Sequence, residues 1–334
     1  MKILFYDIDN IELEYFLNNS LNVVEPYFFK IPLNKKTYID KKYSNAEAIS
    51  VFVQSELSKE VLEQFKELKF IFLRSTGYSH VDLKFCKENN IKVFYVPEYG
   101  SDSVAEYVFA LLFNISRNVT KASSDLKNGN IDKEELTGYE LKNKNIGVIG
   151  AGAIGKRVLD IAQAFKMNTF TYDIAKDGNY NYVSLDKLLN LSDFVVLCCP
   201  LNDSTKYLIN RNTINKMKTN AVLINVSRGE VVEVESIYDA IVNKKLKGAG
   251  LDVIECEQTL CMKYKDCNKK YEIKANCAKK YLFSSKLLQM DNIIITPHIA
   301  YNTYEAKNKI VKTTIENIKS VFDINSGTKN LILL

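Results

Sequence analysis

A glycine-rich turn between two strand-like runs constrains the fold of this chain more than any other feature. The apolar run Ile146–Ile149 is short enough for a buried strand, and it leads into the turn Gly150–Gly155, which reads G-A-G-A-I-G. An amphipathic segment follows, and a second strand-like run, Thr169–Tyr172, ends on Asp173. This order of strand, turn, helix, strand and terminal acid is typical of a dinucleotide-binding unit rather than of an ordinary glycine-rich turn.

Each glycine of the turn has a physical role in such a unit. Gly150 makes the tight turn, Gly152 lets a pyrophosphate approach the backbone, and Gly155 lets helix and strand pack closely. The helix N-terminus presents unpaired N–H groups and the positive end of a dipole to the phosphates. Asp173 would accept hydrogen bonds from ribose hydroxyls and repel a 2′-phosphate, so the pattern predicts NAD rather than NADP.

Length and composition limit the classes of protein to which the chain can belong. Its 334 residues are enough for two domains with separate cores. No apolar run approaches the roughly 20 residues that span a bilayer, and no signal-like segment follows Met1, so we expect a cytoplasmic protein without a membrane partner. The net charge of +5 is spread along the chain, which argues against nucleic-acid binding. The seven cysteines are expected to be reduced thiols.

Residues 1–99 alternate strand-like and helical patterns, which predicts a parallel sheet with helices on both faces. The strand-like runs are Ile3–Tyr6, Ala48–Val53, Phe70–Leu73 and Val93–Val96, and the helical patterns are Ile11–Asn18 and Lys59–Glu67. Polar loops follow two of these strands, at residues 74–80 and 97–100. Ligands bind beyond the carboxyl ends of strands in such sheets, so both loops are candidate sites, although each also reads as an ordinary connection.

The chain from residue 146 contains six strand-like runs, the number in a full dinucleotide-binding sheet. They are Ile146–Ile149, Thr169–Tyr172, Phe194–Cys198, Ala221–Asn225, Ala249–Val253 and Ile293–Thr296. A capping box at Ser103–Glu106 predicts the start of a long helix before them, and residues 121–141 read as an arm or a surface loop and helix. Helical spacing over Glu305–Phe322 predicts a C-terminal helix that packs on the first domain.

A long connection lies between Glu257 and His298. Cys256 directly precedes it, and Cys261, Cys267 and Cys277 lie within it. Their spacing contains no C-x-x-C pair, so a zinc site is only weakly indicated. We favour a lysine-rich surface insertion with reduced thiols and predict no metal. The sequence does not indicate a role for this insertion.

Residues that suit acid–base chemistry follow three of the predicted strands. His298, one of two histidines in the chain, is suited to donate a proton to a carbonyl that is being reduced. Arg228 can bind a carboxylate through two parallel hydrogen bonds, and Glu257 can stabilise and orient an imidazolium. Taken singly, each reads as a surface or structural residue. Together with NAD, the three predict hydride transfer to a 2-oxo acid.

In combination these motifs resemble the D-isomer-specific 2-hydroxyacid dehydrogenases over nearly the whole chain. The resemblance rests on residues 74–77, on the glycine turn with Asp173, and on residues 225–229, 251–257 and 297–303. It implies an α/β fold of two doubly wound parallel-sheet domains. Residues 1–99 with 300–334 would form a flavodoxin-like substrate-binding domain, and residues 100–299 a Rossmann NAD-binding domain that also forms a homodimer.

The resemblance also implies roles for individual residues. Arg228 would hold the substrate carboxylate and keto oxygen, His298 would be the acid/base, and Glu257 would support it. The cofactor would be bound by Gly150, Gly152, Ala153, Ile154, Gly155, Asp173, Cys199, Pro200, Thr205, Val226, Ser227, Arg228 and Asp252. The substrate would contact Thr76, Gly77, Tyr78, Tyr99, Arg228, His298 and Tyr301.

Within the family the chain most resembles the D-lactate dehydrogenase branch. The run H-I-A-Y-N-T from His298 and Tyr99 before Ser103 are similar to that branch, and Ala153 replaces the arginine usual elsewhere in the family. The expected reaction is therefore reduction of pyruvate to D-lactate with NADH. A dehydrogenase for larger branched or aromatic 2-oxo acids is one alternative, and an NAD(H)-sensing binding protein on the same fold is another. The intact set of Arg228, Glu257 and His298 favours an enzyme.

Overall fold

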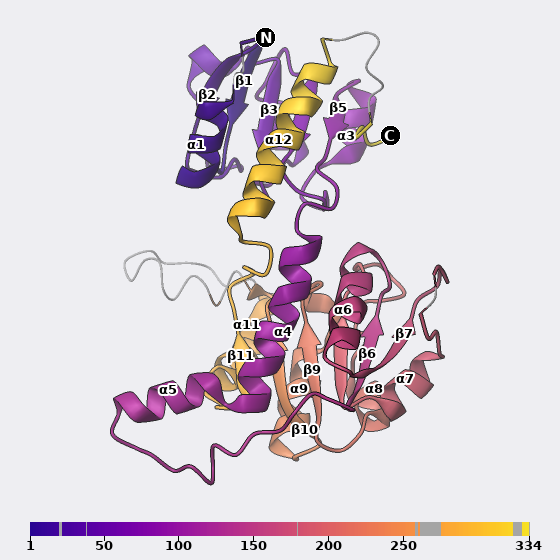
Figure 1. The fold of residues 1–334 in the computed structure, drawn as a ribbon. Helices are drawn as coiled ribbons and strands as arrows, with labels where there is room; N and C mark the ends of the chain where they lie inside the picture. The colour runs from indigo at the N-terminus through magenta and orange to yellow at the C-terminus, as the bar shows by residue number, and fades with distance from the viewer. Residues whose placement is uncertain are drawn as a thin grey trace. The chain divides into compact units, whose positions relative to one another are not determined.

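The computed structural model describes residues 1–19, 22–37, 39–178, 180–257, 260, 275–322 and 329–333. The chain forms two compact units, residues 1–99 with 302–334 and residues 100–301. Each unit contains one parallel sheet with helices on both of its faces (Figure 1). The predicted α/β class with two doubly wound sheets is therefore confirmed.

The sheet of the first unit has the strand order β2-β1-β3-β4-β5, which is the flavodoxin-like order. Its strands are β1 (Lys2–Phe5), β2 (Glu25–Phe28), β3 (Ala48–Val51), β4 (Phe70–Leu73) and β5 (Lys92–Phe94). The sequence did not predict β2. This edge strand contains Pro26 and is at most half-buried, so it lacks the apolar run by which the inner strands are recognised.

Successive side chains along a strand of the first unit point to opposite faces of the sheet, and a separate core lies on each face. Ile3 and Phe5 pack with α1 (Asn10–Asn18) and α12 (Tyr304–Ser320), whereas Leu4 and Tyr6 point to the opposite face. That face is covered by the short helices η1 (Lys41–Tyr43), α2 (Lys59–Leu62) and α3 (Leu83–Glu88). The C-terminal helix, yellow in Figure 1, thus belongs to the first unit, as its periodicity predicted.

The sheet of the second unit contains all six predicted strands, in the order β11-β10-β9-β8-β6-β7. They are β6 (Asn145–Ile149), β7 (Asn168–Tyr172), β8 (Phe194–Leu197), β9 (Ala221–Asn225), β10 (Leu246–Leu251) and β11 (Ile293–Ile295). An isolated parallel bridge between Thr171 and Tyr182 lies beyond β7, where the Rossmann order places a further strand. The strand order reverses between β6 and β8, and ligands bind at such a reversal.

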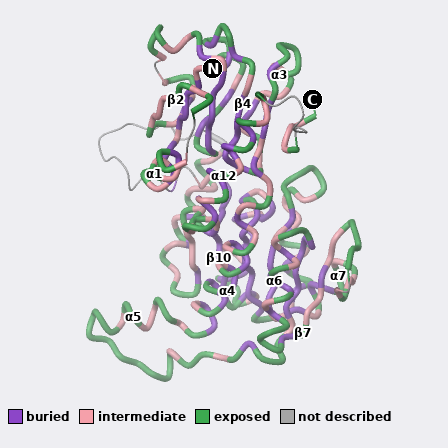
Figure 2. The backbone as a smooth tube through the Cα atoms, turned by 45° about the horizontal axis from the view of Figure 1, so that its top comes forward, coloured by how far each residue is buried: buried purple, intermediate pink, exposed green. Residues whose placement is uncertain are grey.

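Helices cover both faces of the second sheet, and alternate residues of β8 show how. Phe194 and Val196 pack with the core under α4 and α6, while Val195 and Leu197 pack on the opposite face. The helices are α4 (Ser101–Arg117), α5 (Val119–Lys127), α6 (Ala153–Ala164), α7 (Leu185–Leu191), α8 (Arg211–Lys216), η2 (Gly229–Val231), α9 (Val234–Val242) and α11 (Ala275–Leu287). The inner strands β6, β8 and β9 are buried along nearly their whole length and are drawn in purple in Figure 2.

The long helix α4 begins at Ser101, before the predicted start at Ser103. Gly100 occupies the N-cap position without a side-chain cap among the described residues, so the capping-box prediction was wrong. The next helix, α5, has no buried residue in the described structure and is exposed or half-buried throughout in Figure 2. None of the helices in the described ranges combines the length and apolar character that a membrane crossing requires.

Candidate active site

The glycine turn brings the ends of β6 and β8 into contact at the strand reversal. Gly150 has a φ of 97°, in the left-handed region that favours glycine. A Cβ atom on Gly150 would also lie 2.6 Å from the backbone nitrogen of Cys199. A Cβ on Gly155 would collide with the carbonyl oxygen of Gly150. Both glycines are therefore required by close approach of the backbone.

The first turn of α6 is open to a ligand. No described heavy atom lies within 4 Å of the position that a Cβ on Gly152 would take, and no side chain of the described residues caps the helix. The unpaired N–H groups are therefore available to an anion. Asp173 accepts hydrogen bonds from the N–H groups of Ala151 (2.6 Å) and Ala175 (2.9 Å), which hold its carboxylate beside the turn. These features fit the pyrophosphate and ribose of a dinucleotide.

The other predicted cofactor residues lie where β8 and β9 end. Cys199 is buried, and burial raises the pKa of its thiol to about 11, so it is neutral at physiological pH. The Thr205 hydroxyl donates to the carbonyl oxygen of Pro200 at 2.6 Å and shapes the loop after β8. Val226 and Ser227 are buried directly after β9. These positions share the carboxyl edge of the sheet with the glycine turn.

A buried asparagine shapes the turn that carries Arg228. The Asn225 side chain accepts hydrogen bonds from the N–H and the hydroxyl of Ser227, at 3.1 and 2.8 Å, and donates to the carbonyl oxygen of Arg228 at 3.0 Å. Gly229 follows, and a Cβ there would collide with the backbone of Ile254 and Glu255. The sequence had not assigned a role to Asn225, because its contacts become visible only once the turn is folded.

The guanidinium of Arg228 is exposed, and most of its donors are unused within the described structure. Its one described hydrogen bond runs from Nη1 to the carbonyl oxygen of Ser227, at 2.7 Å. It forms no ion pair with a carboxylate of the described residues, so the alternative of a surface salt bridge is not observed there. The remaining N–H groups are available to bind a carboxylate of a ligand.

Asp252 holds the segment that carries His298. Its buried carboxylate accepts hydrogen bonds from the N–H groups of Ile299 and Ala300, each at 2.9 Å, and from the Thr296 hydroxyl at 2.6 Å. Its carbonyl oxygen accepts from the His298 N–H at 2.9 Å. Sequence reasoning gave Asp252 only a cofactor role. The sequence did offer a signal for this structural role, because Asp252 is an acidic residue at the end of a buried strand.

The structure brings His298 and Glu257 together. His298 Nδ1 and Glu257 Oε1 are 3.0 Å apart, and each side chain is 36% exposed. Because Nδ1 faces the carboxylate, Nε2 is the ring nitrogen left to exchange a proton with a ligand. The Tyr301 ring lies edge-on to the imidazole, with 6.4 Å between the ring centroids.

The predicted substrate-binding residues of the first unit lie in the loops after β4 and β5. The Thr76 hydroxyl donates to the carbonyl oxygen of Val96 at 2.8 Å, which links the two loops, and Gly77 accepts from the Ser75 hydroxyl at 2.7 Å. Tyr78 is exposed. Tyr99 is the last residue of this unit's first segment.

Two polar residues near these loops are part of the protein interior. Arg74 is fully buried and pairs with Glu12 at 3.2 Å, so it belongs to the core although it leads the loop motif. His80 has a buried Nε2 without a hydrogen-bond partner among the described residues, and burial lowers its pKa to about 4. Of the two histidines, His298 is the one with a carboxylate partner in the described structure.

The expectation of reduced cysteines was wrong for two residues. Cys256 and Cys277 form a disulfide, with their Cα atoms 5.8 Å apart, because α11 returns the chain to the end of β10. Sequence spacing did not reveal this long-range approach. Cys86, Cys198 and Cys199 are free, and Cys261 and Cys267 lie outside the described residues.

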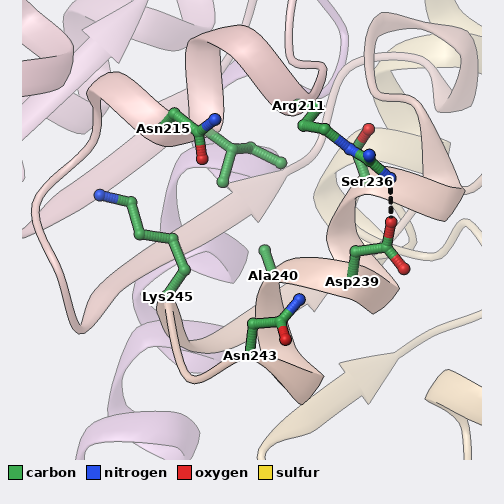
Figure 3. Close-up of a pocket in the computed structure, with 8 residues that line it drawn as sticks. Arg211, Asn215, Ser236, Asp239, Ala240, Asn243 and Lys245 are labelled. Atoms are coloured by element: carbon green, nitrogen blue, oxygen red, sulfur yellow. Dashed lines mark hydrogen bonds and ion pairs between the residues drawn. The ribbon is translucent and has the colours of Figure 1, made fainter.

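A separate cavity of about 330 Å³ lies between α8 and α9 (Figure 3). Arg211, Asp239 and Lys245 contribute to its polar lining, and Arg211 and Asp239 form an ion pair across it. It contains none of the predicted site residues.

Comparisons with known proteins identify relatives of the chain along nearly its full length. A family profile described as D-isomer specific 2-hydroxyacid dehydrogenase, NAD binding domain, matches residues 109–300. The D-lactate dehydrogenase of Escherichia coli (strain K12) is 31% identical over 330 residues, which cover 96% of this chain and 97% of that protein. The hydroxypyruvate reductase of Thermotoga maritima is 34% identical over 287 residues, or 85% and 87% of the two chains.

A solved structure shares the fold. It is that of the D-lactate dehydrogenase from Aquifex aeolicus complexed with NAD and lactic acid, with a TM-score of 0.84 and 33% sequence identity. The match covers 96% of this chain and 95% of that one.

Proposed function

The chain belongs to the D-isomer-specific 2-hydroxyacid dehydrogenases, NAD-dependent oxidoreductases that act on CH–OH groups, and from this premise we propose that it reduces pyruvate to D-lactate with NADH. The observation that carries the proposal is the pairing of His298 with Glu257 at 3.0 Å. Relatives that are named D-lactate dehydrogenases support pyruvate as the substrate.

The residues along the carboxyl edge of the second sheet would hold NAD. The open N-terminus of α6 suits the pyrophosphate, and Asp173 suits the adenosine ribose. Ala153, Ile154, Cys199, Pro200, Thr205, Val226 and Ser227 would line the remainder of the cofactor site. When bound, NADH supplies the hydride that reduces the keto carbon.

Arg228 would bind and polarise the substrate. Its unused N–H groups can hold the carboxylate of a 2-oxo acid in a bidentate geometry, with a further donor near the keto oxygen. This contact would orient the keto group and draw electron density toward its oxygen, which makes the carbonyl carbon more electron-poor and easier for a hydride to attack. The same contact would hold the 2-hydroxy acid in the reverse reaction.

His298 would supply the proton to the keto oxygen through Nε2. Glu257 would hold the ring through Nδ1 and stabilise its charged form before the proton leaves. Asp252 would keep the backbone of this segment in place through its hydrogen bonds to residues 299 and 300. In the oxidation of D-lactate, neutral His298 would accept the proton from the hydroxyl group.

The aromatic ring beside His298 supports a small substrate. Tyr301 lies edge-on to the imidazole, so its ring would border the space that the side chain of a 2-oxo acid occupies. By the family resemblance, Thr76, Gly77, Tyr78 and Tyr99 would complete the substrate contacts from the first unit.

Steady-state oxidation of NADH with pyruvate, 2-oxoisocaproate and phenylpyruvate tests this assignment. We expect the highest kcat/KM with pyruvate and D-lactate as the sole enantiomer on chiral chromatography. Tyr301→Ala should raise the relative kcat/KM for phenylpyruvate while leaving the affinity for NADH unchanged. If the unmodified enzyme prefers 2-oxoisocaproate or phenylpyruvate, the assignment of pyruvate as the substrate is wrong. If it turns over none of the three acids, the proposed activity is refuted.

We also infer that the enzyme is a cytoplasmic homodimer that associates through its NAD-binding unit. Exposed apolar residues on and after α5, namely Val119, Leu126 and Ile131, support an association surface there. Light scattering after size exclusion should give twice the chain mass of 38.2 kDa. A monomer at micromolar concentration would contradict the inference.

A further inference from the structure

The helix α11 is attached at two points to the residues immediately before Glu257. Cys277 forms the disulfide with Cys256, and Lys280 forms an ion pair with Glu255. Residues 277 and 280 are i and i+3 on the helix and therefore lie on the same face. The helix is thus attached to Glu255 and Cys256, the two residues directly before the acid that contacts the imidazole of His298.

The polar attachment point is buried and closely packed. Glu255 is 5% exposed, and its Oε1 contacts both the Lys280 ammonium and the Tyr207 hydroxyl. Lys280 also donates to the Tyr207 hydroxyl at 2.6 Å. Glu255 Oε2 is buried without a partner among the described residues, so this carboxylate depends on Lys280 for its counter-charge. These contacts hold Glu255 in place, and Cys256 and Glu257 follow it directly in the chain.

The disulfide is adjacent to the candidate acid–base pair. Cys256 has a φ of 58°, a left-handed conformation that is costly for a residue other than glycine and that must be held by its surroundings. The Glu257 N–H donates to the carbonyl oxygen of Ile254 at 3.1 Å and closes the turn. Because the disulfide joins the strained residue to α11, its cleavage releases one of the restraints that direct Glu257 toward His298.

Both cysteines are half-buried, so a small thiol can reach the disulfide. A disulfide in a reducing compartment is usually transient and redox-sensing rather than purely structural. Cleavage requires two equivalents of a thiol. The first thiolate attacks one sulfur and forms a mixed disulfide, and the second displaces that group. The protein gains two electrons and two protons as two cysteine thiols, and the attacking thiols leave as their own disulfide.

We propose that the Cys256–Cys277 disulfide is a thiol-sensitive control of the Glu257–His298 pair, which keeps the carboxylate in place when oxidised and releases it when reduced. This inference rests on the proposed function, because it acts through the acid–base pair. The oxidised enzyme retains 2-oxo acid reduction at neutral and alkaline pH, and the reduced enzyme loses part of it. Besides Glu257, the titratable and charged side chains of this site are Asp252, Tyr301, the proposed substrate-binding Arg228, and Tyr107, which lies beside Thr296 and Asp252.

The test compares the full-length enzyme before and after treatment with dithiothreitol. Mass spectrometry of peptides from the untreated protein should find Cys256 linked to Cys277, and the treated protein should have both as thiols. For each form, kcat/KM for pyruvate is measured against pH, together with the Kd of NADH. Reduction of the disulfide should lower kcat/KM for pyruvate about threefold on the alkaline limb of the pH profile. A displacement of that limb by about half a pH unit toward acid has this effect. The Kd of NADH should not change.

Variants separate this effect from general damage by the reductant. Cys277→Ser should show the displaced limb without dithiothreitol and should no longer respond to it. Cys86→Ser, which removes a buried free thiol of the first unit, should respond as the parent enzyme does. If a variant does not fold, the comparison of the parent enzyme before and after reduction still decides the matter.

The profile of Glu257→Gln separates failure of this inference from failure of the proposed function. If Glu257→Gln displaces the limb but reduction of the disulfide does not, the inference is wrong and the acid–base pair remains. If Glu257→Gln itself leaves the profile unchanged, both are wrong. Free thiols at Cys256 and Cys277 in protein purified without reductant, or equal loss of activity at all pH values on reduction, would also overturn it.

Discussion

Replacement of Arg74 by methionine should destabilise the first unit severely. The guanidinium is fully buried and pairs with Glu12, whose side chain is 6% exposed, at 3.2 Å. It also donates to the Ser50 hydroxyl at 3.2 Å and to the carbonyl oxygens of Tyr6 and Asp7 at 2.9 and 2.6 Å. Arg74→Met leaves the buried Glu12 carboxylate without its cation, although the Asp9 N–H still donates to it, and the loss of the counter-charge costs about 3–5 kcal/mol. This is a large part of the roughly 5–15 kcal/mol that stabilises a folded domain.

Urea unfolding followed by circular dichroism measures this loss, since the chain has no tryptophan. Lys69→Met is the matched control, because it removes the cation of an exposed pair with Glu47, also at 3.2 Å, and should cost less than about 1 kcal/mol. The double variant Arg74→Met/Glu12→Gln should be more stable than Arg74→Met, because it removes the unpaired charge. Equal losses for Arg74→Met and Lys69→Met would refute the assignment of Arg74 to the buried core.

Three further predictions concern the cofactor, the substrate and the stability of the enzyme. Asp173 should oppose the 2′-phosphate of NADPH, so kcat/KM with NADH should be higher by on the order of tenfold or more, and equal values would rule out this role. Arg228→Lys loses the bidentate contact and should lower kcat/KM for pyruvate by about 10- to 100-fold with little change in NADH affinity, whereas normal kinetics would exclude Arg228 from substrate binding. His80 should destabilise the enzyme in mild acid, because its pKa is lowered from 6.5 to about 4 and only the unfolded chain takes up the proton in that window. The free energy of unfolding should fall by up to about 2 kcal/mol between pH 7 and pH 5 in the parent enzyme, and His80→Gln should lack that part of the loss.

Local patterns in the sequence predicted the framework of both units. The inner strands were recognisable because they are buried on both faces and therefore read as apolar runs, as in β8 and β9. The glycine turn was recognisable because close approach of the backbone excludes other residues at Gly150 and Gly155. The edge strand β2 escaped prediction, since an edge strand that is at most half-buried has no such signature.

These local patterns did not predict where one helix ends or which distant segments come into contact. Helix α2 ends at Leu62, although the helical spacing continues to Glu67, because spacing does not specify where the backbone turns away. The disulfide of Cys256 with Cys277 depends on the return of α11 to the end of β10. The family resemblance singled out Arg228, Glu257 and His298, and the structure adds the geometry, including the hydrogen bonds of Asp252 to the segment that carries His298.

The pH dependence of the Glu257→Gln variant tests the central claim most directly. The substitution removes the charge 3.0 Å from the imidazole and keeps the size of the side chain. The substitution therefore removes the electrostatic attraction between the carboxylate and the charged form of the ring. Pyruvate reduction requires protonated His298, and D-lactate oxidation requires the neutral form.

The alkaline limb of pyruvate reduction and the acidic limb of D-lactate oxidation should therefore both move toward acid pH when kcat/KM is measured against pH in both directions. Profiles of the two proteins that superimpose would show that Glu257 is not coupled to His298, and would contradict the proposed acid–base pair.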